Sequence, residues 1–227
     1  MQAPFTRPPD QLGIVVPDLE AEIKRWLERG VGPFYTIGGA MLSHYVYRGE
    51  RSSPRVSAAF GQAGPLQLEL IQPDDDERSA YREFVDAGGN GLHHFGWFSD
   101  DLDRDRTTAE GGTGLSLVQT GQVLGTPFAY YEPSEPWPAA GLLDTLTAEG
   151  PQAQEALSEA RGWDGRLLEV LAPNSMSRKT FAEVRQAAAE WDGRTEPVRH
   201  LLGHMMEGAF ELQTLAQRVG RWFSERA

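Results

Sequence analysis

The feature that most constrains the fold of this chain is a weak internal repeat. The segment QLGIVVPDL at positions 11–19 and the segment that begins at position 94 share one layout. Three pairs of residues have the same separation of 83 positions: Gln11 and His94, Gly13 and Gly96, and Asp18 and Asp101. Repeats of this kind indicate duplicated units that complete each other's core. We therefore expect two similar modules.

A second repeated pattern marks the last strand of each module. The segments LELIQP at 68–73 and LEVLAP at 168–173 both place Leu-Glu before two aliphatic residues and end on proline. Glu69 and Glu169 are 100 positions apart, and the larger separation reflects an insertion at 133–165. A long insertion beside a binding strand is typical of a functional loop.

Hydrophobic periodicity predicts the order β-α-β-β-β in each module. In the first module we expect strands at 10–16, near 40–48, near 54–60 and at 66–73, with a helix that starts after the N-cap Asp18. The second module has predicted strands at 92–98, 115–119, 126–132 and 167–173. Further helices are expected near 79–85, 102–110 and 151–161. From Ser177 the pattern predicts two helices, the second beginning near 195–197 with an apolar stripe from Val198 to Trp222.

Composition narrows the classes of partner and compartment. The formal net charge of −12 disfavours binding to nucleic acid or to an anionic membrane. There is no cysteine, so disulfides, thiolate metal ligands and cysteine nucleophiles are excluded. No apolar run approaches the roughly 18 residues of a membrane span, and the N-terminus lacks the apolar region of a secretory signal. A cytoplasmic protein is expected.

Five segments in this order resemble the vicinal oxygen chelate superfamily, also called the glyoxalase fold: QLGIVVPDL at 11–19, GVGPF at 30–34, LELIQP at 68–73, GLHHFG at 91–96 and LEVLAP at 168–173. The GVGPF and LHH segments are most similar to the branch that contains methylmalonyl-CoA epimerase. The resemblance implies an α+β fold in which two paired βαβββ modules form a curved mixed sheet around a metal cleft. The domain would span residues 8–174, with modules at about 8–73 and 92–174, and residues 177–227 would form a helical C-terminal extension.

The resemblance also implies four metal ligands, one from the first and one from the last strand of each module. They are Gln11, Glu69, His94 and Glu169. His94 is preferred over His93 because it aligns with Gln11 in the repeat, and adjacent residues of a strand point to opposite faces. The set is similar to the ligands of one class of lactoylglutathione lyase. The epimerase pattern would instead place His at position 11 and Gln at position 69.

The ligand chemistry suits a divalent cation. Three oxygen ligands and one imidazole nitrogen fit Zn²⁺, Ni²⁺, Co²⁺, Mn²⁺ or Mg²⁺. Such a metal polarises a carbonyl and stabilises the enediolate that forms when the adjacent carbon loses a proton. Glu169 or Glu69 is then the candidate base. We expect a metal-dependent isomerase, epimerase or lyase that acts on a small oxygenated molecule and assembles as a homodimer.

Two other functions stay open on the same fold. A metal-free binding protein would resemble the bleomycin-resistance relatives, which sequester a drug and lack the ligand set. An extradiol-type dioxygenase would need two histidines and one carboxylate on Fe(II). Three aromatic residues, Tyr130, Tyr131 and Trp137, are candidates for the wall of the cleft, although aromatics near a proline-rich loop more often only pack.

Overall fold

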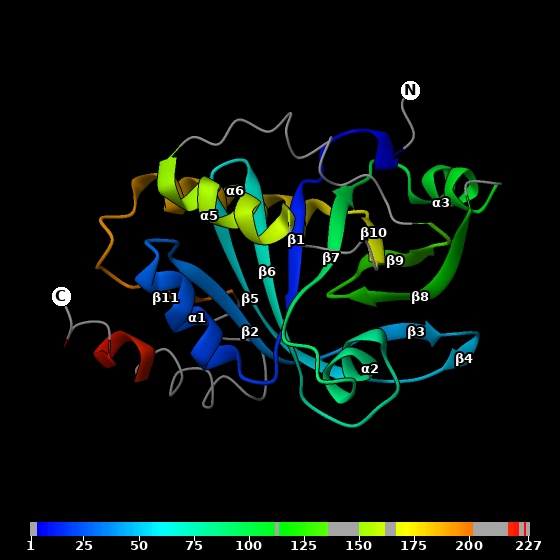
Figure 1. Ribbon diagram of the computed structural model, residues 1–227, viewed down its shortest axis with the longest axis horizontal. Helices are drawn as coiled ribbons and strands as arrows, with labels where there is room; N and C mark the ends of the chain where they lie inside the picture. The colour runs from blue at the N-terminus through cyan, green and yellow to red at the C-terminus, as the bar shows by residue number, and fades with distance from the viewer. Residues whose placement is uncertain are drawn as a thin grey trace.

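A computed structural model describes residues 4–111, 114–135, 150–161, 167–201, 218–222 and 225. Its centre is one large mixed sheet of eleven strands with helices packed against it (Figure 1). The strand order is β11-β2-β5-β6-β1-β7-β10-β9-β8-β3-β4. The expected mixed α+β fold with a curved sheet is confirmed.

The order of the core strands repeats, as the sequence predicts. The first module contains β1 (Gln11–Val15), α1 (Leu19–Glu28), β2 (Phe34–Met41), β5 (Arg55–Ala63) and β6 (Leu66–Pro73). The second contains β7 (Gly91–Phe98), α3 (Leu102–Glu110), β8 (Leu115–Val123), β9 (Thr126–Pro133) and β10 (Leu167–Leu171). The short helix α2 (Ala80–Asp86) lies between them in the chain. From the centre outward the strands run β1-β6-β5-β2 on one side and β7-β10-β9-β8 on the other.

The Asp-Leu pair that follows the first strand of both modules has a local cause. The side chain of Asp18 accepts a hydrogen bond from the backbone N–H of Ala21 and caps α1. Asp101 accepts one from the N–H of Arg104 and caps α3 in the same way. A carboxylate at this position satisfies a free N–H and complements the helix dipole. The repeated Asp-Leu therefore marks the strand-to-helix turn in both modules.

A hairpin of the first module ties the two halves together. It consists of β3 (Ser43–Tyr47) and β4 (Glu50–Arg51), and β3 pairs antiparallel with β8 of the second module. Only Leu42 separates the end of β2, on one side of the sheet, from the start of β3 on the other. The hairpin has no counterpart in the described part of the second module.

Two predicted elements are wrong. The strand expected near 40–48 is two strands, β2 and β3, and β2 already begins at Phe34. Gly39 has a φ of 60° and lies in an irregularity of the β2–β5 register between Ile37 and Ala40, so a sequence that looks like a turn is a bulge within the strand.

The helix expected from 195–197 is also wrong at its start. Residues Val198–His200 form β11, which pairs parallel with β2.

The remaining C-terminal helices pack on opposite faces of the sheet. Helix α6 (Ser175–Glu190) follows β10, and helix α5 (Gly150–Arg161) lies within the predicted insertion (Figure 1). Leu157 of α5 belongs to the buried cluster that contains residues of α1, whereas Val184 of α6 belongs to the buried cluster on the other face. Residues 218–222 are helical, whereas 202–217, which carry most of the predicted apolar stripe, lie outside the described residues. The extension is therefore not entirely helical as expected, because β11 belongs to it.

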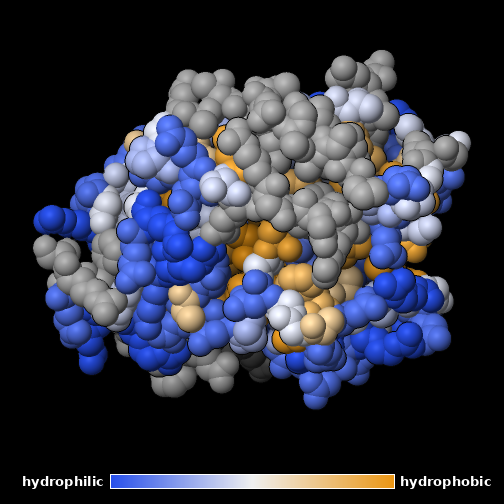
Figure 2. Space-filling model, in the orientation of Figure 1, coloured by the Kyte–Doolittle hydropathy of each residue, from blue (hydrophilic) through white to orange (hydrophobic). Residues whose placement is uncertain are grey.

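Apolar side chains fill both sides of the central strands. One cluster packs α1 against the sheet through Ile23, Trp26 and Leu68, all of them buried. In the view of Figure 2 the described surface is mostly polar, and apolar residues reach it mainly in the middle. No helix in the described ranges is long and apolar enough to cross a membrane.

Candidate metal centre

The four predicted ligands come from four adjacent strands, β6, β1, β7 and β10. Register places Gly13 of β1 between Glu69 of β6 and His94 of β7. Residues in register on neighbouring strands present their side chains on the same face of a sheet. Glu69 and His94 therefore reach toward each other across a glycine.

The second pair has the same relation one step along the sheet. Gly96 of β7 lies between Gln11 of β1 and Glu169 of β10. The repeat thus puts a polar ligand beside a glycine twice, Gln11 beside Gly96 and His94 beside Gly13. This arrangement gives the repeated glycines a structural role at the site.

Three of the predicted residues meet within a small volume. His94 Nε2 lies 3.3 Å from Glu169 Oε2 and 3.7 Å from Glu69 Oε2. The nearest ligand atoms of the three side chains all lie within 4.8 Å of one another. His94 is fully buried, Glu169 is 3% exposed, and the side chain of Glu69 keeps 15% of its surface accessible. Among the residues that the structure describes, this is the acidic and imidazole cluster with metal-site spacing.

The two glycines allow these side chains to lie flat against the sheet. A Cβ atom on Gly13 would lie 1.8 Å from Cε1 and 2.1 Å from Nε2 of His94. A Cβ on Gly96 would lie 2.7 Å from Gln11 Oε1 and 3.2 Å from Glu169 Oε2. The imidazole therefore occupies the space above Gly13, while the oxygens of Gln11 and Glu169 meet above Gly96.

The polar atoms above Gly96 lack partners within the described protein. Gln11 donates its amide N–H to Gln67 Oε1 at 2.8 Å, which leaves Gln11 Oε1 free. Glu169 Oε2 is likewise buried without an aligned hydrogen bond, although it lies close to His94. Buried acceptors without a donor are destabilising by about 1–3 kcal/mol each. Two such oxygens beside an imidazole nitrogen and a second carboxylate fit a divalent cation.

The carboxylates of Glu69 and Glu169 shift the pKa of His94, and Glu169 and His94 shift the pKa of Glu69. Burial alone would lower the pKa of His94, but its hydrogen bonding to Glu169 and Glu69 and their negative charges raise it to about 9. Burial and the neighbouring Glu169 charge raise the pKa of Glu69, although His94 opposes this shift. Without a cation, a proton on His94 is the positive charge that the described residues place between the two carboxylates.

The expectation that strand alternation separates the two histidines is wrong in detail. Gly13 pairs with His94 but the next residue, Ile14, pairs with Leu92, so His93 is the extra residue of a bulge. His93 Nδ1 consequently lies 3.0 Å from His94 Nδ1, with the rings perpendicular. The predicted choice of His94 as the residue beside the carboxylates agrees with this geometry, and His93 is the neighbour that fixes the His94 ring.

Tyr130, one of the three aromatic candidates for the wall of the cleft, lies beside the cluster. Its hydroxyl lies 3.2 Å from His94 Nε2 and accepts a hydrogen bond of 3.0 Å from the hydroxyl of Tyr81. Burial raises the pKa of both tyrosines well above the usual value, so both keep their protons. Tyr130 pairs with Glu169 across β9 and β10, as Phe60 pairs with Glu69 in the first module. This equivalence was the available signal in the sequence.

Of the other two aromatic candidates, only Tyr131 lies within the described residues, and it is not part of the cluster. Tyr131 points away from the cluster, because its hydroxyl donates to Glu110 at 3.1 Å and its ring packs beside Phe5. Trp137 lies outside the described residues.

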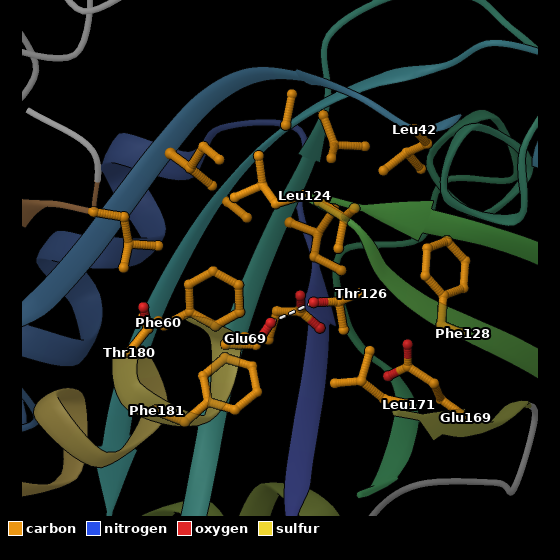
Figure 3. A pocket seen from close by; sticks show the side chains of 18 of the residues that line it. Leu42, Phe60, Glu69, Leu124, Thr126, Phe128, Glu169, Leu171, Thr180 and Phe181 are labelled. Carbon is orange, nitrogen blue, oxygen red and sulfur yellow. Dashed lines mark hydrogen bonds between the residues drawn. The ribbon is translucent and has the colours of Figure 1, made fainter. Parts of the chain in front are cut away.

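A cavity opens directly onto the carboxylates (Figure 3). It contains about 870 Å³ of empty space, counted out to the solvent. Glu69, Glu169, Tyr81 and Tyr130 line its polar part, and the rest of its wall is mostly aliphatic and aromatic. Helix α6 supplies part of the wall through Thr180 and Phe181.

Paired βαβββ modules, with a Glu/His/Glu cluster where their first strands meet, define a protein of the glyoxalase fold. The family model of the Glyoxalase/Bleomycin resistance protein/Dioxygenase superfamily matches residues 10–130. Because the match covers more than half of the chain, the chain belongs to this superfamily. No curated protein matches it.

Several solved structures are similar to this chain at low identity. A variant of Streptomyces coelicolor methylmalonyl-CoA epimerase in complex with 2-nitronate-propionyl-CoA is 17% identical, over 74% of this chain and 96% of that one, with a TM-score of 0.44. Methylmalonyl-CoA epimerase from Mycobacterium tuberculosis is 19% identical, over 80% and 97%, with a TM-score of 0.43. A hypothetical protein from Bacillus halodurans is 17% identical, over 75% and 96%, with a TM-score of 0.43. Likeness at this level identifies neither a substrate nor a reaction.

Proposed function

We propose that this protein is a metal-dependent isomerase, epimerase or lyase that moves a proton at a carbon next to a carbonyl group. The observation that carries the proposal is the buried cluster of Glu69, His94 and Glu169 at the base of a cavity, with the unpaired oxygen of Gln11 beside it. Perturbed acids and bases in a cleft are a common mark of a catalytic site.

Four side chains would hold the cation: Gln11 through Oε1, His94 through Nε2, and Glu69 and Glu169 through a carboxylate oxygen. When bound, a divalent cation polarises a carbonyl oxygen and makes the neighbouring C–H more acidic. His93 Nδ1, 3.0 Å from His94 Nδ1, supports this assignment, because a ligating imidazole usually donates its second N–H to a fixed acceptor.

The two carboxylates are the groups that move the proton. Both line the cavity, and Glu69 is the more accessible. Without a cation, burial and the nearby charge of Glu169 raise the pKa of Glu69, and a carboxylate in this position can act as a general base. If one carboxylate removes the proton and the other returns it from the opposite side, the centre is epimerised. If one carboxylate does both on neighbouring carbons, the product is an isomer.

The alternative functions have less support. An extradiol-type centre needs two histidine ligands, whereas His93 turns its Nδ1 toward His94 and only His94 lies beside the carboxylates. A metal-free binding protein would gain nothing from two buried carboxylates and unpaired oxygens, since these groups destabilise an empty cavity. We also propose that residues 8–174 form the catalytic unit, to which the extension from α6 adds a wall.

Exchange of a carbonyl-adjacent proton with deuterated water tests the proposal before a substrate is known. The protein, loaded with Zn²⁺, Ni²⁺ or Mn²⁺, is incubated with 2-hydroxy ketones, 2-oxo acids and acyl thioesters. Glu169→Gln should retain metal, because an amide oxygen still coordinates, and lose about 10²–10⁴-fold of the exchange rate. Glu69→Gln gives the same loss if that residue is the base.

Glu183→Gln is the matched control, because Glu183 is an exposed residue of α6 with only a distant Lys179 partner at 3.8 Å. It should leave exchange unchanged. Exchange that persists in both cluster variants would refute the carboxylate base. A metal-loaded wild type that exchanges none of the compounds would refute the reaction.

A further inference from the structure

We propose that the substrate is an electrically neutral carbonyl compound with an apolar alkyl or aryl tail, such as a long-chain or aromatic 2-hydroxy ketone. We expect that anionic molecules of the coenzyme A thioester, phosphate ester or dicarboxylate classes are not substrates. This inference rests on the proposed function for the reacting head of the molecule, and on the cavity alone for its tail.

The wall of the cavity beyond the carboxylates is apolar. Its side chains come from both modules and from the C-terminal extension, and they include Ile37, Leu42, Phe60, Phe128, Phe181 and Leu201. Figure 3 shows both glutamates among apolar side chains, with Glu69 near Phe60 and Phe181, and with Leu42 farther away. A molecule that places a carbonyl at the carboxylates therefore extends its other end along hydrocarbon.

The hydroxyl groups in the wall are largely used by each other. Thr126 and Ser177 hydrogen-bond to each other, one from β9 and one from α6. Tyr81 donates to Tyr130, which points to His94. The wall accordingly presents little unpaired polar surface to the tail of a ligand.

Charge excludes an anionic tail. Glu69 and Glu169 are the ionisable acids of the described lining, and no lysine, arginine or histidine is among its described residues. A divalent cation would cancel the two negative charges of these carboxylates, and the described lining offers no further cation to a phosphate or a second carboxylate. An anion buried in an apolar wall without a partner is strongly disfavoured.

Helix α6 forms part of the apolar wall beside Glu69. The ring of Phe181 lies 5.8 Å from that of Phe60 and stacks on Phe98 at 5.2 Å, which joins the helix to both modules. The helix lies beyond residues 10–130, the part matched by the family model. The extension therefore contributes to the wall that would contact the tail.

The test combines a binding probe with exchange. N-phenyl-1-naphthylamine, a neutral dye that fluoresces in apolar surroundings, is bound to the metal-loaded protein and displaced by three compounds: 1-hydroxy-2-octanone, hydroxyacetone and dihydroxyacetone phosphate. We expect 1-hydroxy-2-octanone to displace the dye at concentrations at least about tenfold lower than hydroxyacetone, because each methylene in an apolar pocket adds affinity. Dihydroxyacetone phosphate should not displace it. The exchange rates at low substrate concentration should follow the same order.

Two variants of α6 localise the effect. Thr180 lines the cavity, whereas Ala182 is exposed two positions along the helix. Thr180→Arg should weaken displacement by 1-hydroxy-2-octanone by about tenfold or more, since it puts a cation into the apolar wall. Ala182→Arg, the control, should behave as the wild type, and circular dichroism checks that both fold.

The outcomes separate the two proposals. If 1-hydroxy-2-octanone displaces the dye but no compound exchanges, the reaction is refuted and the apolar cavity is supported. If dihydroxyacetone phosphate or methylmalonyl-CoA exchanges as fast as the apolar ketone, the substrate class is overturned and the reaction stands. Failure of both the dye and the ketone to bind also overturns the substrate class, as does wild-type binding by Thr180→Arg.

Discussion

Replacement of Gly13 by alanine tests the geometry of the metal centre without touching a ligand. The new Cβ would lie 1.8 Å from Cε1 of the His94 ring, and ordinary contact begins near 3.4 Å. The ring must therefore move by about 1.6 Å, roughly three times the 0.5 Å within which a working site must be held. Because His94 is fully buried, it has no open space to move into except toward the carboxylates or the cavity.

The expected loss of metal affinity follows from that displacement. Disturbing groups that merely orient a ligand typically costs about 10–100-fold in metal affinity, and here a ligand itself is moved. A loss of that size corresponds to about 1.4–2.7 kcal/mol. Overpacking also costs about 1–3 kcal/mol of folding free energy, so stability and metal affinity must be measured separately.

Gly61→Ala is the matched control. A Cβ on Gly61 would lie 2.6 Å from the ring of Phe34, a core residue next to α1. It should therefore destabilise the fold by a similar amount, about 1–3 kcal/mol, without disturbing the ligands. Titration calorimetry with Ni²⁺ gives the affinities directly. Thermal unfolding with and without metal provides a second measure, because a ligand that binds the native state raises its stability.

The reasoning would be refuted by a Gly13→Ala variant that binds Ni²⁺ as tightly as the wild type. It would also fail if Gly61→Ala lost as much affinity as Gly13→Ala, since the effect would then come from general destabilisation. Gly13→Ser should reproduce the effect of Gly13→Ala, as both introduce a Cβ at the same place.

Four further outcomes are expected. Gly96→Ala should weaken metal binding less than Gly13→Ala, because the atoms that its Cβ meets belong to the flexible Gln11 and Glu169 side chains, and calorimetry compares the two. Metal affinity should rise by about tenfold for each pH unit up to pH 9, because the pKa of His94 is about 9 and its proton must leave; competition titrations at three pH values measure the slope. Tyr130→Phe should lower the free energy of unfolding by about 1–3 kcal/mol in urea, since the Tyr81 hydroxyl loses its acceptor. Light scattering at micromolar concentration should give twice the monomer mass, and a monomer mass would refute the dimer.

The positions of the four ligand candidates could be predicted because the repeat carries register. Side-chain direction alternates along a strand, so matching Gln11 with His94 and Glu69 with Glu169 places all four on one face. The same logic failed at His93, where an inserted residue breaks the alternation. Nothing in the local residue types distinguishes that bulge from a regular strand.

Tyr130 could be named from the sequence as a candidate for the wall of the cleft, but the repeat does not identify its position beside Glu169. It opposes Glu169 as Phe60 opposes Glu69, but only nine positions separate Phe60 from Glu69 and 39 separate Tyr130 from Glu169. Strand pairing shows that Tyr130 corresponds to Phe60, although the sequence separations from the paired glutamates differ. Counting along the chain therefore recovers the first strand of each module and misses the third.

The strand β11 could not be predicted because its cause is tertiary. Proline near the start of an apolar stripe favours a helix, and the stripe itself has helical spacing. In the structure the edge of β2 offers unpaired backbone groups, and Val198–His200 satisfy them. The backbone O of Pro197 also accepts a hydrogen bond from Phe34 N at 2.9 Å. A neighbouring edge outweighed a local preference.

The single residue between β2 and β3 has a mechanical consequence. Leu42 is buried, and the chain passes through it from the outer part of the first module to the outer edge of the second. The two halves are therefore joined by strand pairing twice, at β1–β7 and at β3–β8. They cannot separate at β1–β7 without also breaking the pairs Ser43–Gln122 and Val46–Thr120. Separation of the two halves of the sheet is therefore disfavoured as a route by which a ligand enters the cavity.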